Sequence, residues 1–220
     1  MKKRRKSVAV LISSGLDSAI LLAQTLKTHT AVYPVYIAGG NFWEKAEENH
    51  LRIFLRKIQN KRLKPLTILS MPLKDIYKNH WSMTGKKSPS FRSPDKAVYL
   101  PGKNLLLIAK TAIFCTRKKI QNIALAPLKT NPFPDATRSF FDHYESVLSK
   151  GLNFRIKIAT PFLLHTKKEV LKKGKGLPLK WTFSCIHPVK NQHCGRCNKC
   201  AERKSAFRLV GVKDPTKYAG

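Results

Sequence analysis

The chain has 220 residues, of which 43 are Lys or Arg and 12 are Asp or Glu, giving a formal net charge of +31. Hydrophobic residues make up 42% and aromatic residues 9%, which is typical of a folded globular protein and excludes a disordered one. No run of 18 apolar residues is present, and the basic N-terminus precedes an apolar stretch too short for a signal peptide. The sequence therefore predicts a soluble, cytoplasmic, single-domain protein.

The charge excess has two interpretations. Phosphate backbones attract cations, so +31 is compatible with a nucleic-acid partner. The basic residues are, however, spread along the whole chain, whereas a dedicated nucleic-acid surface more often concentrates them in a patch or arm. A generally lysine-rich composition explains the charge equally well at this point.

Short apolar runs alternate with amphipathic segments along the chain. The expected strands are 8–12, 31–38, 66–69, 120–126 and 156–160. A first helix is expected from residue 18, and further helices over 44–58, 104–116 and 136–149. Thr166, with Glu169 three residues later, has the form of a capping box that opens another helix. The polar stretch 77–98 contains two prolines and is expected to be a mobile, functional loop.

This alternation predicts an α/β fold with a doubly wound parallel sheet, because right-handed crossovers place helices on both faces. The expected organisation is a main α/β part over residues 1–180 and a small C-terminal appendage over 181–220, within one structural unit.

The turn between the first strand and the first helix consists of small polar residues, Ser13-Ser14-Gly15-Leu16-Asp17-Ser18. In an open parallel sheet, ligands bind at the carboxyl ends of the strands, where this turn is expected to lie. Backbone N–H groups and hydroxyls at a helix N-terminus can converge on phosphate oxygens, and Asp17 could orient the loop or hold Mg²⁺. The alternative is an ordinary turn in which Ser13 or Ser14 caps the helix.

Four of the five cysteines crowd into the last fifth of the chain, at positions Cys185, Cys194, Cys197 and Cys200. Four thiolates without an open coordination position are typical of a structural Zn²⁺ site. An iron–sulfur cluster is the rival interpretation, and a disulfide pair is the weakest. His187 and His193 lie close enough in sequence to compete as ligands. Cys115 stands alone in an apolar run and is expected to be a buried hydrophobic residue.

The turn at 13–18 resembles the SGGxDS signature of the PP-loop ATP pyrophosphatases, which include ligases and tRNA-modifying enzymes. The resemblance implies that seven residues bind ATP: Ile12, Ser13, Ser14, Gly15, Leu16, Asp17 and Ser18. Ser14 stands where that family usually has its first glycine. If the position requires a positive φ, serine is strained there, and Ser14→Gly would preserve or raise ATP turnover.

Motifs along the rest of the chain resemble, in their order, those of the 7-cyano-7-deazaguanine synthases. The matching segments are Leu100-Pro101-Gly102-Lys103-Asn104, Pro134-Asp135, Thr166-Lys167-Lys168-Glu169, Trp181-Thr182-Phe183-Ser184-Cys185, the cysteine run 193–200, Glu202-Arg203-Lys204-Ser205-Ala206-Phe207 and the tail 210–218. Two departures concern the substrate side. Lys103 replaces an arginine, and the segment 131–137 lacks a tyrosine before Pro134 and a Cys-Arg pair after Asp135.

The resemblance implies an adenine nucleotide alpha-hydrolase-like fold and an ATP-dependent ligase of queuosine and deazapurine biosynthesis. Such an enzyme converts 7-carboxy-7-deazaguanine and ammonia into the 7-cyano compound through an amide, with ATP, Mg²⁺ and Zn²⁺ as cofactors. The implied catalytic residues are Asp17, Ser18 and Lys167. The implied substrate-binding residues are Lys103, Asn104 and Asp135, for which a surface or capping role is the alternative.

Three other functions stay open from the sequence. One is a related ligase that joins a carboxylate to a different amine, and another is a tRNA-modifying PP-loop enzyme. The third is a nucleotide-binding module without catalysis. Free ammonia is expected as the nitrogen donor, since no glutaminase nucleophile is apparent, and a homodimer and weak RNA association are expected as secondary properties.

Overall fold

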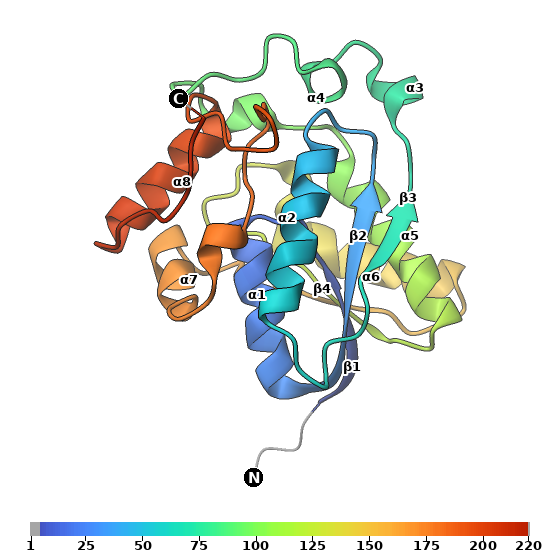
Figure 1. Ribbon diagram of the computed structural model, residues 1–220. Helices are drawn as coiled ribbons and strands as arrows, with labels where there is room; N and C mark the ends of the chain where they lie inside the picture. The colour runs from blue at the N-terminus through green and yellow to red at the C-terminus, as the bar shows by residue number, and fades with distance from the viewer. Residues whose placement is uncertain (1–4, 220) are drawn as a thin grey trace.

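The computed structural model describes residues 5–219 and shows five strands with helices on both sides (Figure 1). The strands are β1 (Arg5–Leu11), β2 (His29–Ala38), β3 (Thr67–Ser70), β4 (Asn122–Ala124) and β5 (Lys157–Ala159). The helices are α1 (Leu16–Thr28), α2 (Glu44–Lys57), α3 (Lys74–Tyr77), α4 (Trp81–Thr84), α5 (Lys103–Arg117), α6 (Arg138–Gly151), α7 (Lys167–Lys173) and α8 (Asn198–Leu209). Short 3₁₀ helices are η1 (Asp95–Val98), η2 (Pro134–Ala136) and η3 (Leu179–Trp181).

All strands run parallel, in the order β3-β2-β1-β4-β5. The chain moves outward from β1 to β3 and then returns to β4 on the other side of β1, so the order reverses beside β1. In such sheets the switch point opens a crevice at the carboxyl ends of the strands. The predicted doubly wound α/β fold is confirmed.

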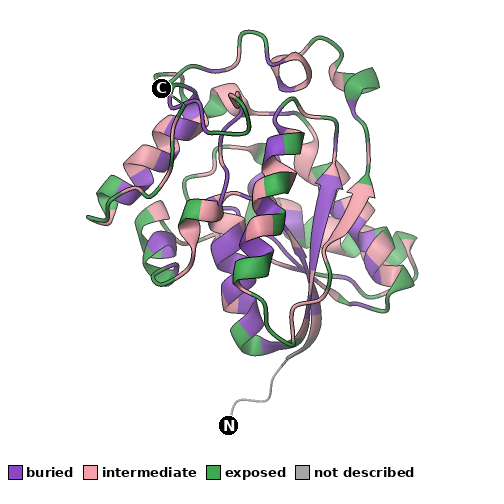
Figure 2. Cartoon of the chain, in the orientation of Figure 1, coloured by how far each residue is buried: buried purple, intermediate pink, exposed green. Residues whose placement is uncertain are grey.

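Two hydrophobic clusters fill the two sides of the sheet. On one side, Val8 and Val10 of β1 pack with α1, α2, α7 and α8. On the other side, Ala9 of β1 packs with α5 and α6. The alternation along β1 sends neighbouring residues to opposite faces, and both faces are covered. Figure 2 shows the buried centre and the exposed outer faces of the helices.

The capping box at α7 is formed as predicted. The Thr166 hydroxyl accepts a hydrogen bond from the Glu169 N–H, and the Glu169 carboxylate accepts one from the Thr166 N–H. The stretch 77–98 is more regular than the expected loop, because it contains α4 and η1. Trp81 of α4 stacks on Trp43 at a ring separation of 5.7 Å, which ties this stretch to α2.

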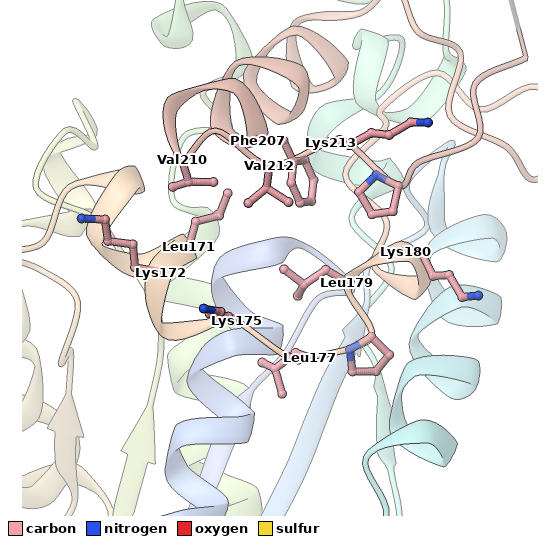
Figure 3. A pocket seen from close by; sticks show the side chains of 14 residues that line it. Leu171, Lys172, Lys175, Leu177, Leu179, Lys180, Phe207, Val210, Val212 and Lys213 are labelled. Carbon is pink, nitrogen blue, oxygen red and sulfur yellow. The ribbon is translucent and has the colours of Figure 1, made fainter.

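An apolar hollow of about 550 Å³ lies between the C-terminal ends of α7 and α8, away from the strand ends. Its apolar side chains are Leu171, Leu177, Leu179, Phe207, Val210 and Val212, with lysines at the rim (Figure 3). Its lining contains no acid, cysteine or histidine, so it offers no side chain typical of a metal site. Within residues 5–219, no helix is long and apolar enough to cross a membrane.

Candidate active site and metal centre

The turn after β1 opens into a cavity of about 320 Å³ at the carboxyl ends of the strands. Ile12, Ser13, Gly15, Asp17 and Ser18 line it. Leu16 does not, since its side chain is buried in the core beneath the turn and anchors the start of α1. The geometry therefore separates the predicted ATP-binding residues into a lining set and a supporting set.

Ser13, Gly15 and Ser18 of this turn are joined by hydrogen bonds. The Ser13 hydroxyl accepts a hydrogen bond from the Gly15 N–H at 3.1 Å, and its oxygen lies 3.1 Å from the Ser18 hydroxyl. Ser18 in turn donates to the Ser13 carbonyl at 3.0 Å. Two hydroxyls and the N-terminus of the 13-residue helix α1 are thus held together at the cavity wall, an arrangement suited to an anion.

Ser14 is the buried member of the turn, with 1% of its surface exposed. Its hydroxyl donates to the Phe183 carbonyl at 3.1 Å, and its carbonyl accepts from the Phe183 N–H at 2.7 Å. Ser14 is not among the residues with positive φ. The backbone here therefore does not require glycine, and the serine hydroxyl instead makes a bond that glycine could not make.

A chain of alternating charges runs from the turn to α8. The Lys167 ammonium lies 2.6 Å from Asp17 Oδ2 and 2.7 Å from Glu202 Oε1, and Lys199 lies 2.7 Å from Glu202 Oε2. Burial alone would lower the pKa of Lys167, but Asp17 and Glu202 outweigh it and the pKa is raised. Lys167 is therefore a fixed cation. The second oxygen of Asp17, Oδ1, is buried and has no hydrogen-bond partner in the described part of the chain.

Glu202 makes the stability of the protein depend on pH below about 4.3. Burial alone would raise its pKa, but Lys167 and Lys199 outweigh burial and lower the pKa to about 2. Since the pKa of an unfolded Glu is about 4.3, the ion pairs stabilise the fold fully above that pH and are lost as the pH falls toward 2.

We expect Glu202→Gln to lower the free energy of unfolding at pH 7 by about 2 kcal/mol and to flatten its decline between pH 4.5 and 2. Urea unfolding across this pH range measures both effects. Asp75→Asn, at an exposed acid on α3, is the control and should change neither. If the free energy of unfolding declines as steeply with falling pH in Glu202→Gln as in the parent, Glu202 is not the cause of the pH dependence.

Glu47 and Lys103 also line this cavity, and each affects the pKa of the other. The Tyr36 hydroxyl donates to Glu47 Oε2 at 2.8 Å, and Lys103 lies 5.5 Å from the Trp43 ring centre, over its face. Burial raises the pKa of Glu47 while Lys103 opposes the shift, and burial lowers the pKa of Lys103 while Glu47 opposes that. Sequence reasoning identified Lys103 but missed Glu47 and Tyr36. The run of acids opening α2 was the available signal.

Asn104 and Asp135 are brought together at the start of α5. Asp135 Oδ2 accepts from the Asn104 N–H at 3.0 Å, and the Asn104 side-chain amide donates to the Asp135 carbonyl at 3.0 Å. Asp135 is 6% exposed and is not part of the cavity lining, whereas Asn104 is. The contacts hold Asn104 in place at the start of α5, while recognition of substrate by Asp135 stays a prediction.

The four C-terminal cysteines meet at one point. Their sulfur atoms all lie within 4.8 Å of one another, and the closest pairs are Cys185–Cys197 at 3.8 Å and Cys194–Cys200 at 4.0 Å. A tetrahedral Zn²⁺ with Zn–S bonds of about 2.3 Å requires sulfurs about 3.8 Å apart. The four residues therefore fit a tetrathiolate metal, and Gly195, with φ of 77°, allows the tight turn between them.

Backbone donors surround the sulfurs. Cys185 Sγ accepts from the N–H groups of His187 and Cys194, each at 3.3 Å, and Cys194 Sγ accepts from the Arg196 N–H at 3.4 Å. Such bonds stabilise thiolate charge around a metal. Neither histidine belongs to the set, because His193 Nε2 accepts from the Ser184 N–H and His187 Nδ1 lies 3.0 Å from the Gly85 carbonyl oxygen.

Comparison with known proteins gives the family. Residues 7–211 match the family described as "Queuosine biosynthesis protein QueC". The chain belongs to the QueC family. A relative from Persephonella marina, named 7-cyano-7-deazaguanine synthase, is 30% identical, and the match covers 97% of each chain. Another with that name, from Methanococcus aeolicus, is 28% identical over 97% of this chain and 99% of its own.

A relative from Desulfitobacterium hafniense, named 7-cyano-7-deazaguanine synthase 1, is 27% identical over 93% of both chains. Among solved structures, a chain described as a predicted subunit of tRNA methyltransferase from Methanocaldococcus jannaschii matches with a TM-score of 0.49 and 16% identity, over 76% of this chain and 73% of that one. The predicted family is confirmed, and this QueC-family chain is similar to the curated relatives over nearly its whole length.

Proposed function

We propose that the protein is an ATP-dependent ligase that converts 7-carboxy-7-deazaguanine and ammonia into 7-cyano-7-deazaguanine. Family membership gives the reaction class, since the curated relatives bear the name of that synthase. The single observation that carries the proposal here is the fixed cation Lys167, held by Asp17 of the phosphate-binding turn and by Glu202. Transfer of AMP from a nucleoside triphosphate requires a fixed cation beside an anion-binding turn.

Two hollows that meet at Asp17 offer places for the two substrates. A hollow of about 110 Å³ shares Asp17 and Asn131 with the larger cavity and is also lined by Phe133, Lys199 and Glu202. We assign the nucleotide to the larger cavity, beside Ser13, Gly15 and Ser18, and the acid to the smaller one. The carboxylate then approaches the α-phosphorus at Asp17, where the two hollows meet. Lys167 lines neither hollow but contacts Asp17 at 2.6 Å, and Lys103 and Asn104 line the larger cavity from the start of α5.

Lysine side chains at this site are paired with aspartate and glutamate side chains. Four of the chain's 12 acidic residues line the two hollows: Asp17, Glu47, Asp95 and Glu202. Because Lys167 and Lys199 are paired with Asp17 and Glu202, they are oriented before substrate binds, and no reorganisation is needed as charge develops. The remaining basic residues are not explained by this chemistry, and weak RNA association stays a prediction for them.

Two metals fit the donor groups. The unpartnered Asp17 Oδ1 is the oxygen donor at the phosphate-binding turn that suits Mg²⁺, which shields phosphate charge when bound. The four cysteines suit Zn²⁺ as a closed structural site, with all four donors supplied by the chain. In this proposal zinc takes no part in the reaction.

The proposed reaction needs two activations. The acid's carboxylate oxygen attacks the α-phosphorus of ATP and pyrophosphate leaves, which gives a mixed anhydride. Ammonia attacks the acyl carbon and loses a proton, and AMP leaves with the former carboxylate oxygen. The amide oxygen then attacks a second ATP, pyrophosphate leaves again, and loss of the amide protons expels AMP to form the nitrile. Lys167 and the helix α1 terminus stabilise the charge on the phosphates in both rounds.

A second candidate function is a ligase that joins the acid to a different amine. It is favoured by the segment 131–137, where Phe133 stands in the place of a family tyrosine and stacks on Tyr99 at 4.9 Å. Phe133 lines the proposed acid site, and it lacks the hydroxyl that a tyrosine would offer there.

Formation of AMP tests the proposal. With ATP, Mg²⁺ and ammonium present, we expect AMP and pyrophosphate to form only when 7-carboxy-7-deazaguanine is added. Guanine, which lacks the carboxylate, is the control acceptor. The reaction would be repeated with a range of primary amines in place of ammonium. If AMP formation requires the acid but is no faster with ammonium than with one of these amines, the second candidate is favoured. Absence of AMP with the acid would overturn both.

A further inference from the structure

Ser14 joins the phosphate-binding turn to the segment that carries the cysteines. Its hydroxyl and carbonyl both pair with the backbone of Phe183, which lies two residues before Cys185. Both partners are buried, with Ser14 and Phe183 each 1% exposed. Water therefore does not replace these bonds when they break. A shift of the segment that carries the cysteines is thus expected to displace the turn, and the reverse.

Phe183 is held from the cysteine side. Its ring lies 4.5 Å from that of His193, whose Nε2 accepts from the Ser184 N–H. His193 immediately precedes Cys194, and Phe183 belongs to the same hydrophobic cluster as the four cysteines. The Phe183 ring also lies 4.9 Å from that of His50 on α2, so its position depends on both α2 and the fold that the four sulfurs impose on the segment.

We infer that Ser14 is a positioning residue that couples metal binding at the four cysteines to nucleotide binding at the turn. The inference rests on the proposed function for its two ligands, zinc and ATP. With the metal in place, Phe183 holds Ser14, and the N–H groups and hydroxyls of the turn keep the geometry that an anion requires. Without it, the segment loosens and the turn loses two buried hydrogen bonds.

The departure of this chain from its family's glycine supports the inference. The backbone at Ser14 has no positive φ, so the serine causes no strain there. What the side chain adds is the hydroxyl that donates to Phe183. A glycine would keep only the bond between the Phe183 N–H and the carbonyl of residue 14, so the serine strengthens an existing link.

Coupling between two ligands is reciprocal, so two dissociation constants must change by the same factor. The first is the dissociation constant of zinc, measured by competition with a chromophoric chelator, with and without saturating Mg²⁺ and α,β-methylene-ATP, a non-hydrolysable analogue. The second is the dissociation constant of the same analogue for zinc-loaded and chelated protein. We expect the analogue to tighten zinc binding and chelation to weaken analogue binding, each by at least fivefold.

Variants assign the coupling to the hydroxyl. Ser14→Ala and Ser14→Gly are expected to reduce both effects about fivefold, because each removes one buried hydrogen bond. Ser70→Ala, which removes an exposed hydroxyl at the end of β3, is the control and should leave both effects unchanged. If zinc and the analogue bind to the parent protein but neither affects the other, or if Ser14→Ala retains the full effect, the inference is wrong. Absence of analogue binding in the parent protein would instead overturn the proposed function, and absence of zinc binding would overturn the zinc site and this inference with it.

Discussion

Replacing Lys167 by alanine is expected to lower the rate of AMP formation by a factor of about 10²–10³, the cost typical of removing one fixed group that stabilises transition-state charge. Lys167 lies between Asp17 and Glu202, so its loss also leaves two carboxylates next to the proposed phosphate site without their shared cation. Steady-state AMP formation at saturating ATP measures the effect. Lys167→Arg keeps the charge and should recover part of the rate.

The neighbouring Lys168 provides the matched control. It is exposed and lies on the same helix, so Lys168→Ala tests whether any loss of charge at this position matters. We expect its rate to stay within twofold of the parent. Circular dichroism and thermal unfolding of Lys167→Ala separate loss of chemistry from loss of fold, since breaking a partly buried ion pair also destabilises the protein. A folded Lys167→Ala protein with at least a third of the parent rate would exclude Lys167 from the phosphate chemistry.

Replacing Cys197 by serine is expected to reduce bound zinc from about one per chain to well below half, and to lower the melting temperature. A closed tetrathiolate site loses a quarter of its ligands, and structural zinc contributes directly to folding. Cys185→Ser should behave alike, since the sulfurs of Cys185 and Cys197 lie 3.8 Å apart. Elemental analysis of purified protein and calorimetry measure the two effects.

Cys115→Ala is the control for the zinc experiment. Cys115 is fully buried in α5 and burial raises the pKa of its thiol to about 12, so it is neither a metal ligand nor a thiolate nucleophile. It should retain all the zinc. Iron in place of zinc, with visible absorption, would favour the iron–sulfur alternative, and a Cys197→Ser protein with a full complement of zinc would contradict the tetrathiolate site.

Local patterns were sufficient to predict the sheet and the cysteine site. Each strand appears in the sequence as a short apolar run, and the capping box at Thr166 is formed by residues three positions apart. The cysteine spacing likewise predicted a cluster whose four sulfurs meet. In these cases the interacting residues are near one another in sequence, or the residue type itself identifies the chemistry.

The contacts that give the site its detail were not predictable, because they join distant residues. Asp135 pairs with Asn104 across 31 positions, and Ser14 pairs with Phe183 across 169. From the sequence alone, serine at position 14 is expected to be strained only if the position requires a positive φ. The structure instead gives it an ordinary backbone and a buried partner, a fact that no local pattern contains. Glu47 was missed for the same reason, since its partner Tyr36 lies on a different element.

Mass spectrometry of the reaction products tests the central claim most directly. Purified protein would be incubated with ATP, Mg²⁺, ¹⁵N-labelled ammonium and 7-carboxy-7-deazaguanine, and the products followed over time. The account predicts a transient ¹⁵N-amide followed by the ¹⁵N-nitrile, 7-cyano-7-deazaguanine. An amide that never advances to the nitrile, or an acid that is recovered unchanged, would contradict it.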